Sequence, residues 1–158
     1  MRNYRDLNVW ERSRVLTLAV YKSTRCFPSD ERFGLTSQIR RSCSSIPASL
    51  AEGCGRRSDG EMARYVQIAM GSGAELSYHL LPSRDLGLLG GGEYTKLETE
   101  LSGIMRMLSG LSQKVRSARG AWVSSQEPTA KSQKLPAVPC CQLDIRASFE
   151  TNHSLRVY

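Results

Sequence analysis

The chain has 158 residues, 40% of them hydrophobic, and a formal net charge of +7. This length suits one domain, and the modest hydrophobic content indicates that part of the chain does not join the core. The N-terminus lacks the apolar segment of a secretory signal, and no run approaches the roughly 18 apolar residues that span a bilayer, so we expect a cytoplasmic protein with no membrane partner.

The cysteines are odd in number, and no two of them have the C-x-x-C spacing of a zinc or redox site. We therefore expect reduced thiols in a cytosolic protein. The five residues are Cys26, Cys43, Cys54, Cys140 and Cys141.

Helical spacing of apolar residues predicts a first helix over about residues 7–25, which Phe27-Pro28 ends. The predicted core face contains Leu7, Trp10, Leu18 and Tyr21. Further apolar residues at 15, 16, 19 and 20 widen this face beyond what one neighbour can cover. We therefore expect a homo-oligomer.

A second helix is predicted over about residues 34–53, with Pro47 expected to bend or break it. Ser58 and Glu61 match a capping box that begins a third helix. Pro82 should kink or end this third helix before a turn at Gly87.

The fourth helix follows three consecutive glycines at 90–92 and has the most regular pattern in the chain, with apolar residues alternating three and four apart from Tyr94 to Val115. The periodicity vanishes from about Ala118. The sequence therefore predicts an all-α, up-down four-helix bundle over residues 1–118 and a disordered or weakly structured tail over residues 119–158.

The patterns of several enzyme classes are missing. Glu75 and His79 are four apart, whereas a di-metal carboxylate bundle uses Glu-x-x-His, so we interpret them as a solvated helical pair. No phosphate-binding P-loop is present, and the adjacent Cys140 and Cys141 are weak evidence for a metal. We predict no enzymatic activity, no cofactor and no metal; a metal-dependent enzyme is the least favoured alternative.

Arginines cluster around the second predicted helix and the start of the third, at Arg40, Arg41, Arg56, Arg57 and Arg64. If these helices pack antiparallel, the last three share one end of the bundle and form a cationic patch suited to nucleic-acid phosphates. The alternative for Arg40 and Arg41 is an ion pair with Glu52, Glu61 or Glu75 that organises the bundle or an oligomer contact.

Several blocks of sequence resemble the bacterial four-helix bundle family that includes proteins encoded in intervening sequences of large-subunit ribosomal RNA. The resemblance extends over about residues 3–116. The blocks are LNVWE at 7–11, GLTSQIRRS at 34–42, SIPASLAEG at 45–53, GRRS at 55–58, IAMGS at 68–72 and DLG at 85–87. The accessory protein of diversity-generating retroelements is similar to this family too.

The resemblance implies a bundle that forms homopentamers and has no enzyme activity. Among the retroelement relatives it implies binding to a reverse transcriptase and to nucleic acid through a basic surface. By position, the recurrent basic residues are Arg40, Arg41, Arg56 and Arg57. The first hypothesis is therefore an oligomeric protein associated with RNA or DNA, and the second is a protein-interaction scaffold that binds no nucleic acid.

Overall fold

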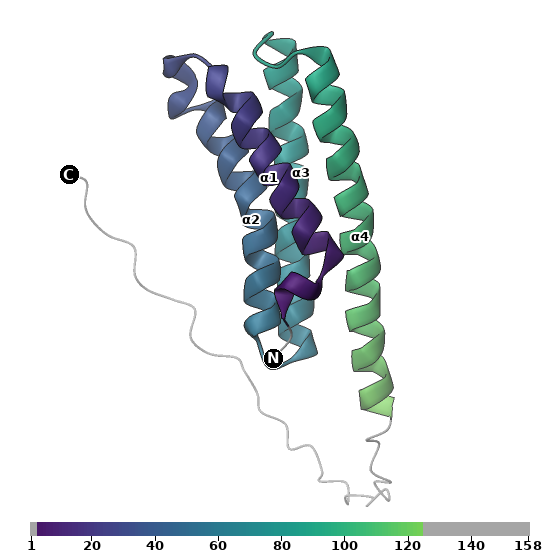
Figure 1. Ribbon diagram of the computed structural model, residues 1–158. Helices are drawn as coiled ribbons and strands as arrows, with labels where there is room; N and C mark the ends of the chain where they lie inside the picture. The colour runs from purple at the N-terminus through teal and green to yellow at the C-terminus, as the bar shows by residue number, and fades with distance from the viewer. Residues whose placement is uncertain (1–2, 125–158) are drawn as a thin grey trace, which may run out of the picture. The chain divides into compact units, whose positions relative to one another are not determined.

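The computed structural model describes residues 3–124, with side chains through residue 117, and this part of the chain contains helices and no strand. The four long helices are α1 (Asn8–Ser23), α2 (Leu35–Gly55), α3 (Asp59–Asp85) and α4 (Gly91–Ser124). They run alternately up and down (Figure 1). Three short 3-10 helices lie before α2: η1 (Tyr4–Asp6), η2 (Thr24–Cys26) and η3 (Ser29–Arg32). The predicted fold is confirmed.

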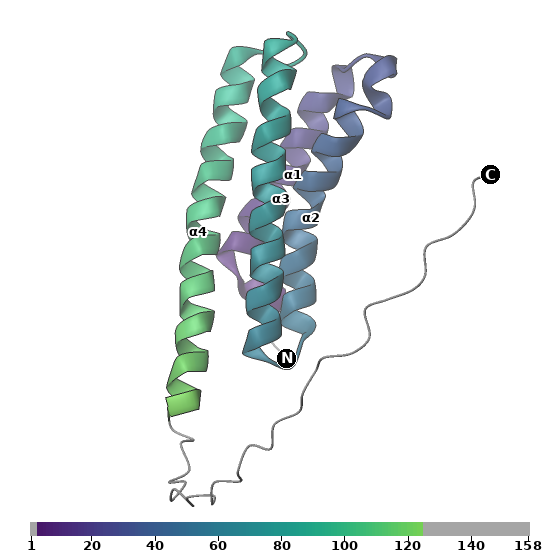
Figure 2. The same cartoon turned by 180° about the vertical axis from the view of Figure 1, so that it is seen from behind.

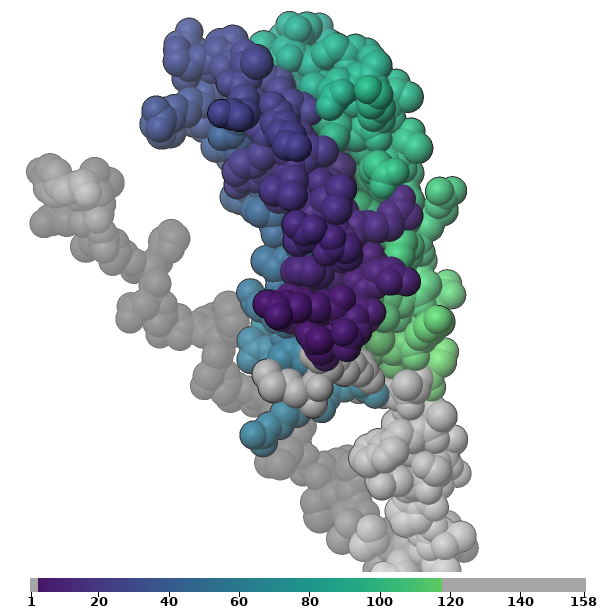
Figure 3. Space-filling view, viewed as in Figure 1, coloured from purple at the N-terminus to yellow at the C-terminus, as the bar shows by residue number. Residues whose placement is uncertain are grey.

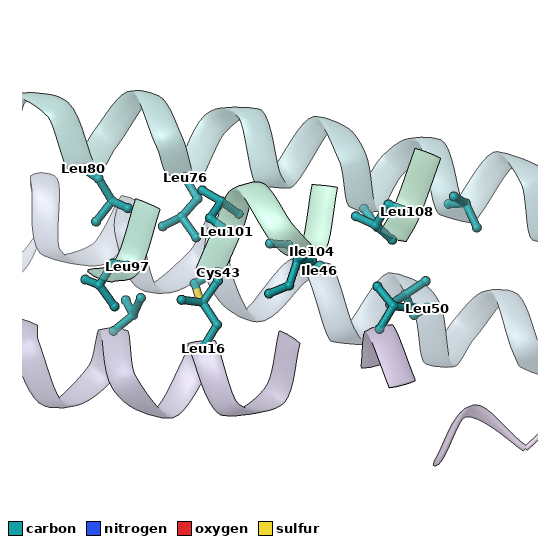
Figure 4. Close-up of a cluster of buried hydrophobic side chains, with 14 of the residues drawn as sticks. Leu16, Cys43, Ile46, Leu50, Leu76, Leu80, Leu97, Leu101, Ile104 and Leu108 are labelled. Atoms are coloured by element: carbon teal, nitrogen blue, oxygen red, sulfur yellow. The ribbon is translucent and has the colours of Figure 1, made fainter. Parts of the chain in front are cut away.

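The hydrophobic core runs the length of the bundle and is shared by all four helices (Figure 4). The largest completely buried aliphatic side chains come from α2, α3 and α4: Ile39, Ile46, Leu50, Leu76, Leu80, Leu101, Ile104 and Leu108. The smaller contribution of α1 consists of Val9, Leu16 and Val20. Apolar residues at helical spacing on four antiparallel helices thus explain the architecture.

The predicted core face of α1 is right in part, because Leu7 and Trp10 pack against the core. Leu18 and Tyr21 are 50% and 42% exposed, whereas Val9, Ser13, Leu16 and Val20 face the core. These buried positions are spaced four, three and four apart, so they form an equally regular face. The small Ser13 side chain bonds the Val9 carbonyl at 2.6 Å, which lets a polar residue occupy this face.

Of the bend or break expected at each internal proline, no break occurs, since α2 continues through Pro47 and α3 through Pro82. Pro47 removes the backbone donor for the Cys43 carbonyl. The Thr17 hydroxyl on α1 lies 3.4 Å from that carbonyl, close enough to offset part of the loss. Pro82 lies in the last turn of α3, and the chain turns only after Asp85, where Gly87 adopts a φ of 72°.

The other boundaries agree more closely with the sequence patterns. The Ser58 hydroxyl accepts a hydrogen bond from the Glu61 backbone amide at 3.1 Å, as the capping box predicts. The fourth helix is longer than expected, because α4 continues beyond residue 118 to Ser124. The remainder of the predicted tail, with Cys140 and Cys141, lies outside the described residues.

Candidate nucleic-acid interface

The short turn between α2 and α3 lies at the end of the bundle that also contains the N-terminus (Figure 1). The two helices approach closely there because Gly53 has no side chain. A Cβ at this position would lie only 2.8 Å from the Met62 sulfur and 2.9 Å from the Tyr65 Cβ. This close antiparallel packing fixes the direction of the turn that carries Arg56 and Arg57.

A hollow of about 470 Å³ opens beside the turn. Its lining residues are Gly53, Gly55, Arg56, Arg57, Ser58, Asp59 and Met62. The first turn of α3 also faces this region, and a helix N-terminus carries a partial positive charge. Asp59 and Glu61 lie in that first turn, so part of this charge is already neutralised by the protein itself.

Arg56, Arg57 and Arg64 lie together at this end, as the antiparallel packing predicts. Arg57 and Arg64 are exposed and have no hydrogen bond, ion pair or ring contact with any described residue. Arg56 donates a hydrogen bond to the Tyr65 hydroxyl at 2.7 Å and stacks 5.2 Å from the centre of its ring. The Tyr65 contact raises the pKa of Arg56, so this guanidinium remains charged.

A fourth basic residue at this end, Arg116, was missed by sequence reasoning. Gln67 on α3 donates a hydrogen bond to the Ser112 hydroxyl on α4 at 2.9 Å, which sets the register of these two helices. Arg64 lies three residues before Gln67, and Arg116 lies one turn after Ser112. Both residues are exposed and lie toward the α2–α3 end of the bundle. The sequence predicts that the third and fourth helices are antiparallel neighbours, and from this it could have been expected that Arg116 lies at the same end as Arg64.

Arg40 and Arg41 do not join this group, since Arg40 and Arg56 are separated by 16 residues of helix, or roughly 24 Å. Arg40 is half-buried and donates to the Thr24 hydroxyl at 2.9 Å and to the Thr24 carbonyl at 3.2 Å. It also stacks 5.0 Å from the centre of the Tyr21 ring. Arg40 therefore caps the C-terminal end of α1.

Arg41 fits the alternative interpretation of a charge that organises the bundle. It bonds the Gln38 side chain at 2.9 Å and forms an ion pair with Glu75 on α3. The same Glu75 carboxylate lies 3.6 Å from His79 Nε2, whose side chain is only 16% exposed. The Glu75–His79 pair is thus less solvated than the sequence pattern predicts. No group of three metal-binding side chains occurs within the described part of the chain.

The described cysteines differ in their surroundings. Cys26 is exposed, whereas Cys43 and Cys54 are buried. Burial raises the pKa of the Cys43 thiol to about 11. Because the thiolate is the reactive form, we expect Cys26 to be alkylated within minutes at pH 8 and Cys43 only after unfolding. Peptide mapping after a brief iodoacetamide pulse measures both rates, and equal labelling of Cys26 and Cys43 in the folded protein would contradict this burial.

The fold and this surface define a class of protein, an up-down helical bundle with a cluster of arginines at its α2–α3 end. None of the helices in residues 3–124 is long and apolar enough to cross a membrane. The chain belongs to the 23S rRNA-intervening sequence protein family, whose model matches residues 5–110. The resemblance seen in the sequence is thereby confirmed.

The fold is shared with a solved structure. It is a protein of unknown function from the S23 ribosomal protein family of Bacteroides thetaiotaomicron VPI-5482. The two chains are 19% identical and superpose with a TM-score of 0.62, over 66% of this chain and 95% of the other. No curated protein matches the sequence.

Proposed function

We propose that this protein is a non-enzymatic, nucleic-acid-associated bundle that binds phosphates through the α2–α3 end. The observation that carries the proposal is the pair of exposed arginines, Arg57 and Arg64, which have no partner among the described residues. Arg56 lies beside them and Arg116 extends the same end. Arginine suits this role because its planar head binds phosphate through two parallel hydrogen bonds.

Structured RNA is the first ligand to consider. The family description refers to an intervening sequence of 23S rRNA. An accessory role beside a reverse transcriptase, with RNA or DNA as the shared ligand, is the other form of the same proposal. Both forms place the phosphates against the same arginines.

The second candidate is a protein-interaction scaffold that binds no nucleic acid. The observation that favours it is the outward face of α1, where Val15, Leu18 and Tyr21 are between 42% and 53% exposed. Clustered apolar residues on a surface commonly mark a protein contact. A homo-oligomer would cover this face and is compatible with either function.

Two double variants, each of which removes two positive charges, distinguish the nucleic-acid-binding function from the scaffold function. The full chain is titrated with a structured RNA hairpin and with duplex DNA, followed by fluorescence anisotropy at several salt concentrations. We expect Arg57→Ala with Arg64→Ala to weaken binding and to reduce the slope of log affinity against log salt by about 1.8, as loss of two phosphate contacts implies. The matched control is Arg14→Ala with Lys96→Ala, which removes two exposed charges away from the α2–α3 end.

The control should bind like the unmodified protein. Equal weakening by the two double variants would mean that only overall charge matters and would overturn the proposed site. Absence of binding by the unmodified protein at low salt would favour the scaffold.

A further inference from the structure

The hollow beside the α2–α3 turn has room for more than a phosphate group. Its volume of about 470 Å³ falls within the range of roughly 300–1,000 Å³ that is usual for small-molecule sites. Two of its lining residues, Gly53 and Gly55, have no side chain, and Met62 supplies an apolar part of the wall. From behind, α2 and α3 lie side by side and meet at this turn (Figure 2), which lies at the lower end of the bundle in the space-filling view (Figure 3).

The guanidinium of Arg56 is covered on one face only. It donates a hydrogen bond to the Tyr65 hydroxyl at 2.7 Å and lies 5.2 Å from the centre of that ring. Arg56 is exposed, and no second ring stacks on it among the residues with described side chains. Because Tyr65 holds the guanidinium in place, its opposite face is a preformed flat surface on a residue that lines the hollow. Guanidinium planes stack in this way on unpaired nucleobases of RNA.

The charges around the hollow favour a base inside it. Asp59 lines the hollow, and its carboxylate disfavours an anion there. A carboxylate has about four acceptor positions, so it can accept hydrogen bonds from a base in addition to its contacts within the protein. Aspartate commonly accepts one from the amino group of cytosine. Arg57 also lines the hollow, and because it has no partner among the described residues it can bind the phosphate of the same nucleotide.

We infer that the hollow binds one unpaired nucleotide of an RNA, with its base stacked on Arg56 and its phosphate held by Arg57. This nucleotide site rests on the proposed function and specifies which part of the nucleic acid is recognised. The edge of the Arg56 guanidinium remains available to a neighbouring phosphate, since stacking uses only its face. Bases within a continuous duplex are stacked and paired, so the protein should prefer an RNA with a bulge or loop.

Two RNA hairpins of equal charge test the nucleotide site. One has a single unpaired cytidine in its stem, and the other has an abasic residue at the same position, so that only the base differs. We expect the full chain to bind the first hairpin about tenfold more tightly, as stacking of one base implies. The ratio of the two affinities should not change with salt, because both RNAs offer the same phosphates. Fluorescence anisotropy measures both affinities.

The variant Arg56→Lys separates stacking from charge. Lysine keeps the positive charge and has no planar face, so the preference for the cytidine hairpin should fall to about twofold or less. The matched control is Arg14→Lys, which makes the same change at an exposed residue of α1 that pairs with Glu11. This control should keep the tenfold preference. Circular dichroism confirms that both variants are folded.

Equal binding of the two hairpins by the unmodified protein would overturn the nucleotide site and leave phosphate binding by the arginines intact. A preference that survives in Arg56→Lys would also overturn it, since the base would then bind elsewhere. Displacement of the cytidine hairpin by an equal concentration of cytidine monophosphate would assign the hollow to free nucleotides instead of RNA. If neither hairpin binds at low salt, the proposed function fails together with the nucleotide site.

Discussion

Replacing Leu76 by alanine is expected to lower the free energy of unfolding by about 3–5 kcal/mol. Leu76 is completely buried in the middle of α3, where it contributes to the core shared by the four helices (Figure 4). The substitution removes apolar contacts and leaves a cavity that rigid neighbouring helices fill only in part. Urea unfolding followed by circular dichroism measures the loss.

The control for this prediction is Leu86→Ala, which makes the same chemical change at a residue that is 65% exposed. We expect it to change the free energy of unfolding by less than about 0.5 kcal/mol. Similar losses for the two leucines would contradict the assignment of the core.

Replacing Arg40 by alanine is expected to cost about 2–3 kcal/mol of stability, an unusually large effect for an arginine. The substitution removes two hydrogen bonds to Thr24 and the stacking on Tyr21. It also leaves Thr24, a buried residue at the end of α1, without its guanidinium partner. Thermal or urea unfolding measures the cost.

Arg57→Ala provides the comparison, because this exposed side chain has no described partner, and its stability should change by less than about 0.5 kcal/mol. RNA affinity should respond in the opposite way, falling for Arg57→Ala and staying constant for folded Arg40→Ala. If Arg40→Ala lost RNA binding and kept its stability, Arg40 would belong to the interface and not to the α1 cap.

The regular parts of the fold could be predicted from the sequence because apolar spacing and capping are local signals. The Ser58–Glu61 cap and the alternation from Tyr94 to Val115 are examples. The core face of α1 could be predicted only in part, since α1 carries apolar residues on two sides and packing against α2 and α4 decides which side is buried. At Pro47 the Cys43 carbonyl has a long-range contact with Thr17, which no local pattern reveals.

The residues of the candidate site could likewise be predicted only in part from the sequence. One assumption, antiparallel packing of neighbouring helices, correctly groups Arg56, Arg57 and Arg64. Distinguishing Arg40 from Arg57 requires knowing what lies opposite each side chain. Arg40 faces the end of α1, and Arg57 faces solvent. Arg116 joins the group only once the register of α3 against α4 is known.

The most direct test of the central claim is the salt dependence with which the unmodified full chain binds a structured RNA hairpin. Contact of Arg56, Arg57 and Arg64 with three phosphates predicts that raising salt from about 50 to 200 mM lowers the affinity roughly 40-fold, and more if several copies bind together. Absence of binding at 50 mM, or an affinity that does not change with salt, would contradict a phosphate-binding surface.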